Sequence, residues 1–176
     1  MSISPVFQMM MDEHKVIVRA LDYCKTLDGR WIEDADGYAG RIRLLADFFR
    51  DYSDGYHHNK EEVDMFKEMI RKNEMLEEGI VGEFLEQHND FRDYVADIRE
   101  AVQAGEWENS FKTLMEYREE LLMHIEAEDD ELFPMAETLF SEAEKENMYF
   151  RFLDIDRELG EERKKAFEDW AEALHS

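Results

Sequence analysis

The sequence predicts an all-α protein that folds as an up-down-up-down four-helix bundle with an additional C-terminal helix. Only 2 Pro and 8 Gly interrupt its 176 residues, and helix-favouring residues are plentiful. Several stretches repeat apolar residues at steps of three and four, the spacing of one helix face, and no long stretch alternates as a strand does. A chain of this length can bury one core. We therefore expect residues 1–140 to form the bundle and residues 141–176 to form a charged helix packed on the same domain.

The first predicted helix runs from Pro5 to about Leu27. Ser4 can cap its N-terminus, and a proline in the first turn costs no hydrogen bond because the N–H there has no helical partner. Alternating steps of four and three place His14 within an apolar stripe that faces a core. The stripe consists of Ile3, Phe7, Met10, His14, Ile17, Leu21 and Cys24.

The second predicted helix runs from about Tyr38 to Lys72, after an acidic loop with two glycines over residues 28–37. The apolar residues of its two halves do not share one face. A kink or bulge near Gly55 would reconcile the two faces, because an irregular turn shifts the phase of every residue after it. This irregularity is expected just before His57.

Two more bundle helices each carry one histidine among apolar residues. The third follows a break at residues 77–82, contains His88 and ends before Gly105, a residue that favours helix ends. The fourth contains His124 and should kink or end at Pro134.

The last predicted helix begins at a capping box. Ser141 and Glu144 stand three residues apart, so each side chain can bond the backbone N–H of the other. From there a strongly charged helix is expected to run towards Leu174.

Two segments of the predicted bundle repeat one pattern. Residues 57–66 and 124–133 each contain histidine, glutamate, an apolar residue and phenylalanine at the same offsets. Residues four apart lie on the same helix face, so each His-x-x-x-Glu presents an imidazole and a carboxylate to one point. Each segment follows a helix with a lone histidine, and a bundle turns all four helices inward. The converging candidates are His14, His57, Glu61, His88, His124 and Glu128.

This set of side chains favours a pair of metal ions. Imidazole and carboxylate without thiolate suit iron or manganese, and carboxylates can bridge two ions, whereas a structural zinc site needs only four ligands. Glu61 and Glu128 are the expected bridges. His14 and His57 would then complete one ion, and the histidines of the third and fourth helices the other. This ligand number leaves a position for a small molecule.

A second His-x-x-x-Glu pair, His58 with Glu62, lies one residue later and is therefore turned by about 100°. The register shared with residues 124–133 favours His57 and Glu61 as the inward pair. His58 is then expected to be a hydrogen-bond donor to a ligand or a surface residue, replaceable without loss of metal, and a fifth histidine ligand is the open alternative.

These motifs resemble those of the hemerythrin-like, HHE cation-binding family over about residues 5–140. The matching pieces are Asp12-Glu13-His14, His57-His58-Asn59-Lys60-Glu61-Glu62, Glu86-Gln87-His88-Asn89-Asp90-Phe91-Arg92, and His124-Ile125-Glu126-Ala127-Glu128 followed by Leu132-Phe133-Pro134. The resemblance implies two iron ions joined by an oxo or carboxylate bridge. Such a centre would bind O2, NO or peroxide, or the protein would handle iron itself. Manganese or zinc is the less favoured metal.

One position departs from the oxygen-carrying hemerythrins, which have a second histidine four residues after that of the third helix. Here the position holds Arg92. The ligand set resembles instead the branch with four histidines and two glutamates, which includes di-iron proteins linked to repair of iron centres.

Charge and cysteine content exclude several other classes. A formal net charge of -24 would repel nucleic acid and anionic lipid, so neither is an expected partner. Asp129, Asp130 and Glu131 form an acidic run expected on the solvated side of the fourth helix. Cys24 is the single cysteine, so neither an internal disulfide nor a thiolate metal site is expected. No targeting or membrane-spanning pattern is found, and we expect a cytoplasmic protein.

The leading functional hypothesis is a non-haem di-iron protein that binds, senses or detoxifies O2, NO or peroxide. The first alternative is a non-catalytic iron-binding or iron-centre-repair module, and the second is a metal-free structural bundle. No catalytic residue and no protein partner is assigned from the sequence.

Overall fold

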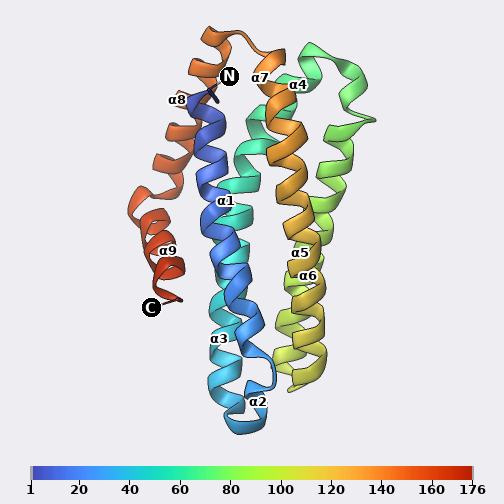
Figure 1. The fold of residues 1–176 in the computed structure, drawn as a ribbon, viewed down its shortest axis with the longest axis vertical. Helices are drawn as coiled ribbons and strands as arrows, with labels where there is room; N and C mark the ends of the chain where they lie inside the picture. The colour runs from blue at the N-terminus through green and yellow to red at the C-terminus, as the bar shows by residue number, and fades with distance from the viewer. Residues whose placement is uncertain (1, 176) are drawn as a thin grey trace.

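The computed structural model describes residues 2–175 and shows four helical columns that lie side by side and alternate in direction (Figure 1). None of the described residues adopts a strand conformation. Two columns are single α-helices, and the other two join α-helices to π-helical segments, labelled η. In chain order the bounds are α1 (Pro5–Cys24); α3 (Ala35–Phe48), η2 (Phe49–His58), η3 (Glu61–Met65) and α4 (Phe66–Lys72); α5 (Ile80–Gln103); α6 (Trp107–Ala127), η5 (Glu128–Leu132) and α7 (Phe133–Leu139). The predicted all-α bundle is confirmed.

The connections between columns are more helical than predicted. The 3₁₀ helix η1 (Lys25–Leu27) directly precedes the expected loop at residues 28–37, and the short α2 (Arg30–Glu33) lies within that loop. The side chain of Asp34 accepts a hydrogen bond from the backbone of Gly37 and so starts α3. The second break contains the 3₁₀ helix η4 (Glu74–Leu76) and ends at Gly79, so it lies a few residues earlier than predicted.

The irregularity predicted near Gly55 is a π-helical stretch, η2, followed after two residues by η3. A π-helical turn takes up one residue more than an α-helical turn, because its hydrogen bonds span five residues instead of four. Neighbouring residues in such a turn are rotated less relative to each other than in an α-helix. Both His57 and His58 lie in this stretch.

The fourth column continues past Pro134 to Leu139, so the helix does not end at the proline, and the predicted kink stays a prediction. Pro134 lies in the first turn of α7, directly after the π-helical segment η5. Ser4 occupies the capping position of α1 as predicted, but its hydroxyl donates to Glu137 instead of capping the helix.

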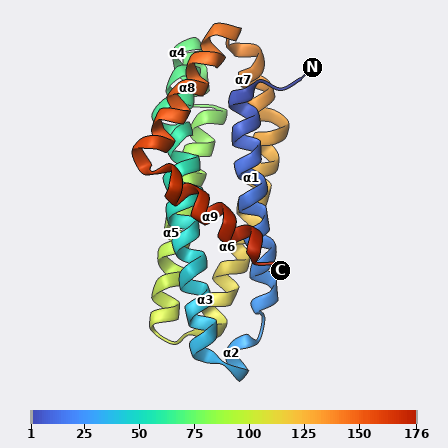
Figure 2. The same cartoon turned by 90° about the vertical axis from the view of Figure 1, so that its left-hand side faces the viewer.

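The C-terminal region forms two helices where the sequence predicted one. The capping box of Ser141 and Glu144 starts α8 (Glu142–Leu159), and α9 (Glu161–Ala173) follows it. Gly160 separates them with φ 106°, a conformation that side chains with a Cβ rarely adopt. Figure 2 shows α8 and α9 crossing the outside of the bundle. The division of the chain at residue 140 stays a prediction.

Two apolar clusters fill the bundle, one at each end. One is built around Leu21, Phe49 and Tyr117, and the other around Phe7, Phe66 and Phe133. A layer of buried polar side chains lies among these apolar residues, and it includes every histidine of the four columns. No helix within residues 2–175 is long and apolar enough to cross a membrane.

Candidate metal centre

The six predicted ligands meet in the buried polar layer, and every column contributes to it. Each of the six is at most 2 % exposed. Potential ligand atoms form two groups within 4.8 Å, which share Glu61: His14, His57, Glu61 and Glu128 in one, and His58, Glu61, His88 and His124 in the other. The structure therefore brings all six side chains together, and their binding of a metal stays a prediction.

Each of the two carboxylates faces both groups of histidines. Oε1 of Glu61 lies 3.5 Å from His57 Nε2, and its Oε2 lies 3.3 Å from His88 Nε2. Glu128 lies in the same way between His14 of α1 and His124 of α6. Each of its two carboxylate oxygens lies 2.9 Å from Nε2 of one of these histidines. One oxygen for each group is the arrangement that a bridging carboxylate needs.

Several buried polar atoms at this point lack hydrogen-bond partners. They are Nε2 of His14 and of His57 and all four carboxylate oxygens of Glu61 and Glu128. The other two predicted histidines face each other with their Nε2 atoms 3.2 Å apart. Burying unpaired polar groups costs several kcal/mol, and more if they are charged. A shared cation would satisfy all of these atoms, so the residues fit a metal.

Every histidine in the layer makes a hydrogen bond at Nδ1, the ring nitrogen that points away from the two carboxylates. Nδ1 faces an acceptor in each case, so in the neutral ring the proton lies on Nδ1 and the lone pair of Nε2 is available, as in histidines that ligate metals. The pairs are His14 with Asp129 (2.7 Å), His57 with Glu13 (3.1 Å), His58 with Asp54 (3.3 Å), His88 with Glu62 (2.8 Å) and His124 with Gln87 (2.6 Å).

Sequence reasoning missed these acceptors. It placed Asp129 on the solvated side of the helix, whereas Asp129 is partly buried against His14. The sequence did offer one indication of these acceptors, because Glu13, Glu62 and Asp129 are each adjacent in the chain to a predicted ligand.

His58 lies inside the layer, so the expectation of a surface position is wrong. It is 2 % exposed, and its ring stacks on that of His88 with centroids 3.9 Å apart. The α-helical offset of 100° suggested that His57 and His58 could not both face inward, but the π-helical geometry of η2 permits it. With Nδ1 turned to Asp54, its Nε2 is the nitrogen available to a metal.

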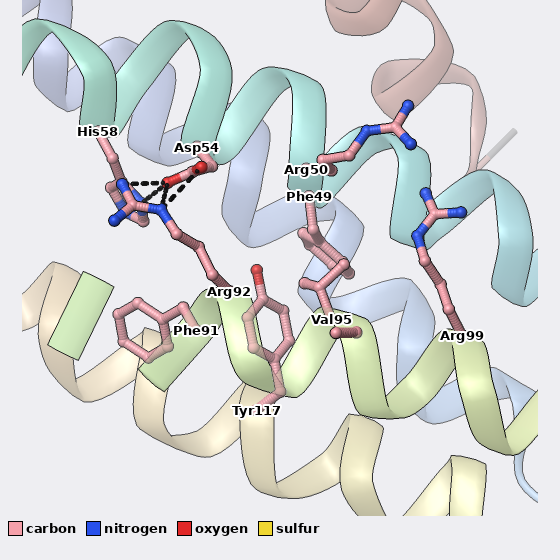
Figure 3. A pocket seen from close by; sticks show the side chains of 10 residues that line it. Phe49, Arg50, Asp54, His58, Phe91, Arg92, Val95, Arg99 and Tyr117 are labelled. Carbon is pink, nitrogen blue, oxygen red and sulfur yellow. Dashed lines mark hydrogen bonds and ion pairs between the residues drawn. The ribbon is translucent and has the colours of Figure 1, made fainter. Parts of the chain in front are cut away.

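Arg92 holds the acceptors of two histidines. Its guanidinium donates to Asp54 at 3.0 Å, and Asp54 accepts from His58 (Figure 3). It also donates to Glu62 at 2.6 Å, and Glu62 accepts from His88. Arg92, the residue that departs from the oxygen-carrying hemerythrins, thus holds in place the carboxylates that orient His58 and His88. The fifth imidazole of the layer comes from His58, which lies in another column.

A buried ion network joins the layer to the C-terminal helices. Lys60, with no exposed surface, donates to Glu13 at 2.6 Å and lies 2.7 Å from Asp156 of α8. Lys164 of α9 lies 3.1 Å from the same Glu13. Burial alone would raise the pKa of Glu13, but the charge of Lys60 and the bond with His57 outweigh it and hold the pKa well below its usual value. Glu13 is therefore a charged acceptor for His57.

Burial and mutual repulsion shift the titration of the central groups. Burial raises the pKa of Glu61, and the neighbouring charge of Glu128 raises it further. Burial lowers the pKa of His88, and lowers that of His58 to about 4. For His14, burial is outweighed by the bond to Asp129 and the contact with Glu128, which raise the pKa to about 9. Without a cation, His14 is thus protonated at neutral pH.

Metal uptake should release protons, because a ligand must be deprotonated to bind. At pH 7 we expect about one proton per chain from His14, whose pKa is about 9. Adding Fe²⁺ anaerobically to metal-stripped protein in weak buffer with a pH indicator measures this. Stoichiometric uptake of metal without any release of protons would contradict metal binding by a protonated His14.

Comparison with known proteins agrees with the geometry. The sequence profile of the hemerythrin HHE cation binding domain matches residues 6–136, and a second, overlapping match covers residues 79–174. No curated protein and no solved structure matches the chain. The first range includes the five buried histidines together with Glu61 and Glu128. The chain belongs to the hemerythrin HHE cation-binding family.

Proposed function

We propose that the protein holds two iron ions in a carboxylate-bridged centre, and that it binds, senses or detoxifies O2, NO or peroxide there. The proposed ligands are His14, His57, Glu61, His88, His124 and Glu128, with His58 as a seventh. When bound, iron would supply a change of oxidation state and an open coordination position. The protein would supply the pocket, the orientation of the ligands and protection from water.

The observation that carries the proposal is the pair of buried carboxylates without hydrogen-bond partners. Glu61 and Glu128 lie among imidazoles and each faces both groups of histidines. A hydrogen-bonded polar core would leave no such atoms, and a single ion would need one group only. Hard oxygen ligands combined with imidazole favour iron or manganese.

The two halves of the proposed centre are unequal. His14 and His57 serve one half, whereas His58, His88 and His124 serve the other. With both carboxylates shared, the first half has one protein ligand fewer. We therefore expect the small ligand to bind at the half held by His14 and His57.

Replacing His58 tests the seventh ligand. If His58 binds metal, His58→Ala should weaken the binding of one of the two ions and lower the iron retained after gel filtration below two per chain, because only the half that contains His58 loses an imidazole. His175→Ala is the control, since that histidine is exposed near the C-terminus. Full iron content in His58→Ala would instead support the sequence-based role as a hydrogen-bond donor.

The proposed function is tested by elemental analysis and absorption spectra of anaerobically loaded protein. About two iron atoms per chain are expected, with spectra that change on adding O2, NO or peroxide. One zinc ion per chain would refute the di-iron proposal. Two bound iron atoms whose spectrum responds to none of the three ligands would support an iron-binding or repair module instead.

A further inference from the structure

A cavity lies beside the histidine layer, between η2, α5 and α6 (Figure 3). Its volume is about 160 Å³. Phe49, Phe91, Val95 and the ring of Tyr117 form its apolar wall, and His58 lies at its inner end. An apolar cavity of about 150 Å³ holds one benzene molecule, so this one has room for a single aromatic ring.

One polar group points into this cavity without a partner. Tyr117 is 1 % exposed, and its hydroxyl has no hydrogen bond to any of the described residues. Burial, reinforced by the nearby charge of Asp54, raises the pKa of Tyr117 well above its usual value. The hydroxyl is thus always protonated, and it can donate to a molecule that enters.

Most other polar groups around the cavity already have partners, although Nε of Arg99 is a second buried donor without one. Asp54 accepts from Arg92, Arg50 donates to Asp51, and Arg99 donates to Asp47. The one carboxylate in the lining, Asp54, is paired with Arg92, whereas the Tyr117 hydroxyl and Nε of Arg99 are left to donate. A buried donor of this kind selects molecules that carry an acceptor.

We propose that this cavity is a binding site for a small aromatic molecule with one ring and a carbonyl oxygen, which accepts a hydrogen bond from Tyr117. The ring would pack between Phe49 and Phe91, where offset or edge-on aromatic contacts are favourable. This site goes beyond the proposed function and does not depend on it, because none of its wall residues is a proposed metal ligand except His58.

The test compares two probes that differ in one group. Benzamide carries ring and carbonyl oxygen, and toluene carries the ring alone. Titrations of the full chain are followed by ligand-observed NMR, with and without two equivalents of Fe²⁺. Benzamide should bind to wild type, and Tyr117→Phe should weaken it about three- to tenfold, the usual worth of one neutral hydrogen bond. Binding of toluene should be unchanged in that variant.

Two variants control for indirect effects. Tyr94→Phe removes a hydroxyl of α5 that bonds Glu120 outside the cavity, and benzamide binding should be unaffected. Ala96→Trp places a large ring at the exposed rim of the cavity and should abolish binding of both probes. The site is refuted if benzamide does not bind, if Tyr117→Phe weakens both probes equally, or if Ala96→Trp leaves both bound. Binding in protein without iron would show that the site exists even if the di-iron proposal fails.

Discussion

Glu128→Gln is expected to remove both metal ions. Glu128 faces both groups of histidines, at 2.9 Å from Nε2 on either side, and an amide cannot replace a bridging carboxylate. Loss of a residue that only hydrogen-bonds a metal ligand lowers metal affinity about 10- to 100-fold. Loss of a ligand shared by both ions should therefore lower it more than about 100-fold. Elemental analysis after gel filtration should find little iron, where wild type retains about two ions.

The matched control is Glu126→Gln, which makes the same charge change at an exposed position two residues earlier on α6. Its iron content should equal that of wild type. Wild-type iron content in Glu128→Gln would contradict the bridging role.

Removing the metal is expected to cause the largest loss of stability. A ligand present at about 1,000 times its Kd stabilises the native state by about 4 kcal/mol, which for a domain of this size raises Tm by roughly 10 °C. In the metal-stripped protein, Glu61 and Glu128 are left facing each other without a cation. Calorimetry of loaded and stripped protein at pH 7 measures the difference, and iron should not raise Tm in Glu128→Gln.

The difference in Tm should depend on pH with a defined sign. The pKa of His14 rises from 6.5 to about 9 in the metal-free fold. Its contribution to the stripped protein is therefore complete below pH 6.5 and lost as pH rises through 9. Metal affinity changes in the opposite direction, because protonated imidazoles do not bind. The Tm difference should widen from pH 6.5 to 9 and shrink below pH 6, where acid should release iron before the chain unfolds. Equal Tm values at every pH would contradict a preorganised centre.

The bundle and the meeting of six side chains could be predicted because both rest on helical spacing. The stripe through His14 and the repeated His-x-x-x-Glu pairs depend only on which residues share a helix face. Such spacing survives small errors in helix ends. It predicted α1, α5 and α6 within a few residues.

The environment of His58 could not be predicted, because the sequence indicates an irregular turn but not its type. A kink and a π-helical stretch both correct the phase near Gly55, and only the second turns His57 and His58 inward together. The outer acceptors of the histidines were missed for a different reason. Their roles depend on contacts between columns, such as Asp129 with His14 and Gln87 with His124, which no single helix pattern specifies.

Crystals of anaerobically iron-loaded protein offer the most direct test of the central proposal. An anomalous difference map recorded at the iron absorption edge locates each ion independently of the protein. We predict two peaks in the buried layer, one beside His14 and His57 and the other beside His88 and His124, with Glu61 and Glu128 between them. A single peak, or iron bound only at surface carboxylates while the layer shows none, would contradict the di-iron centre.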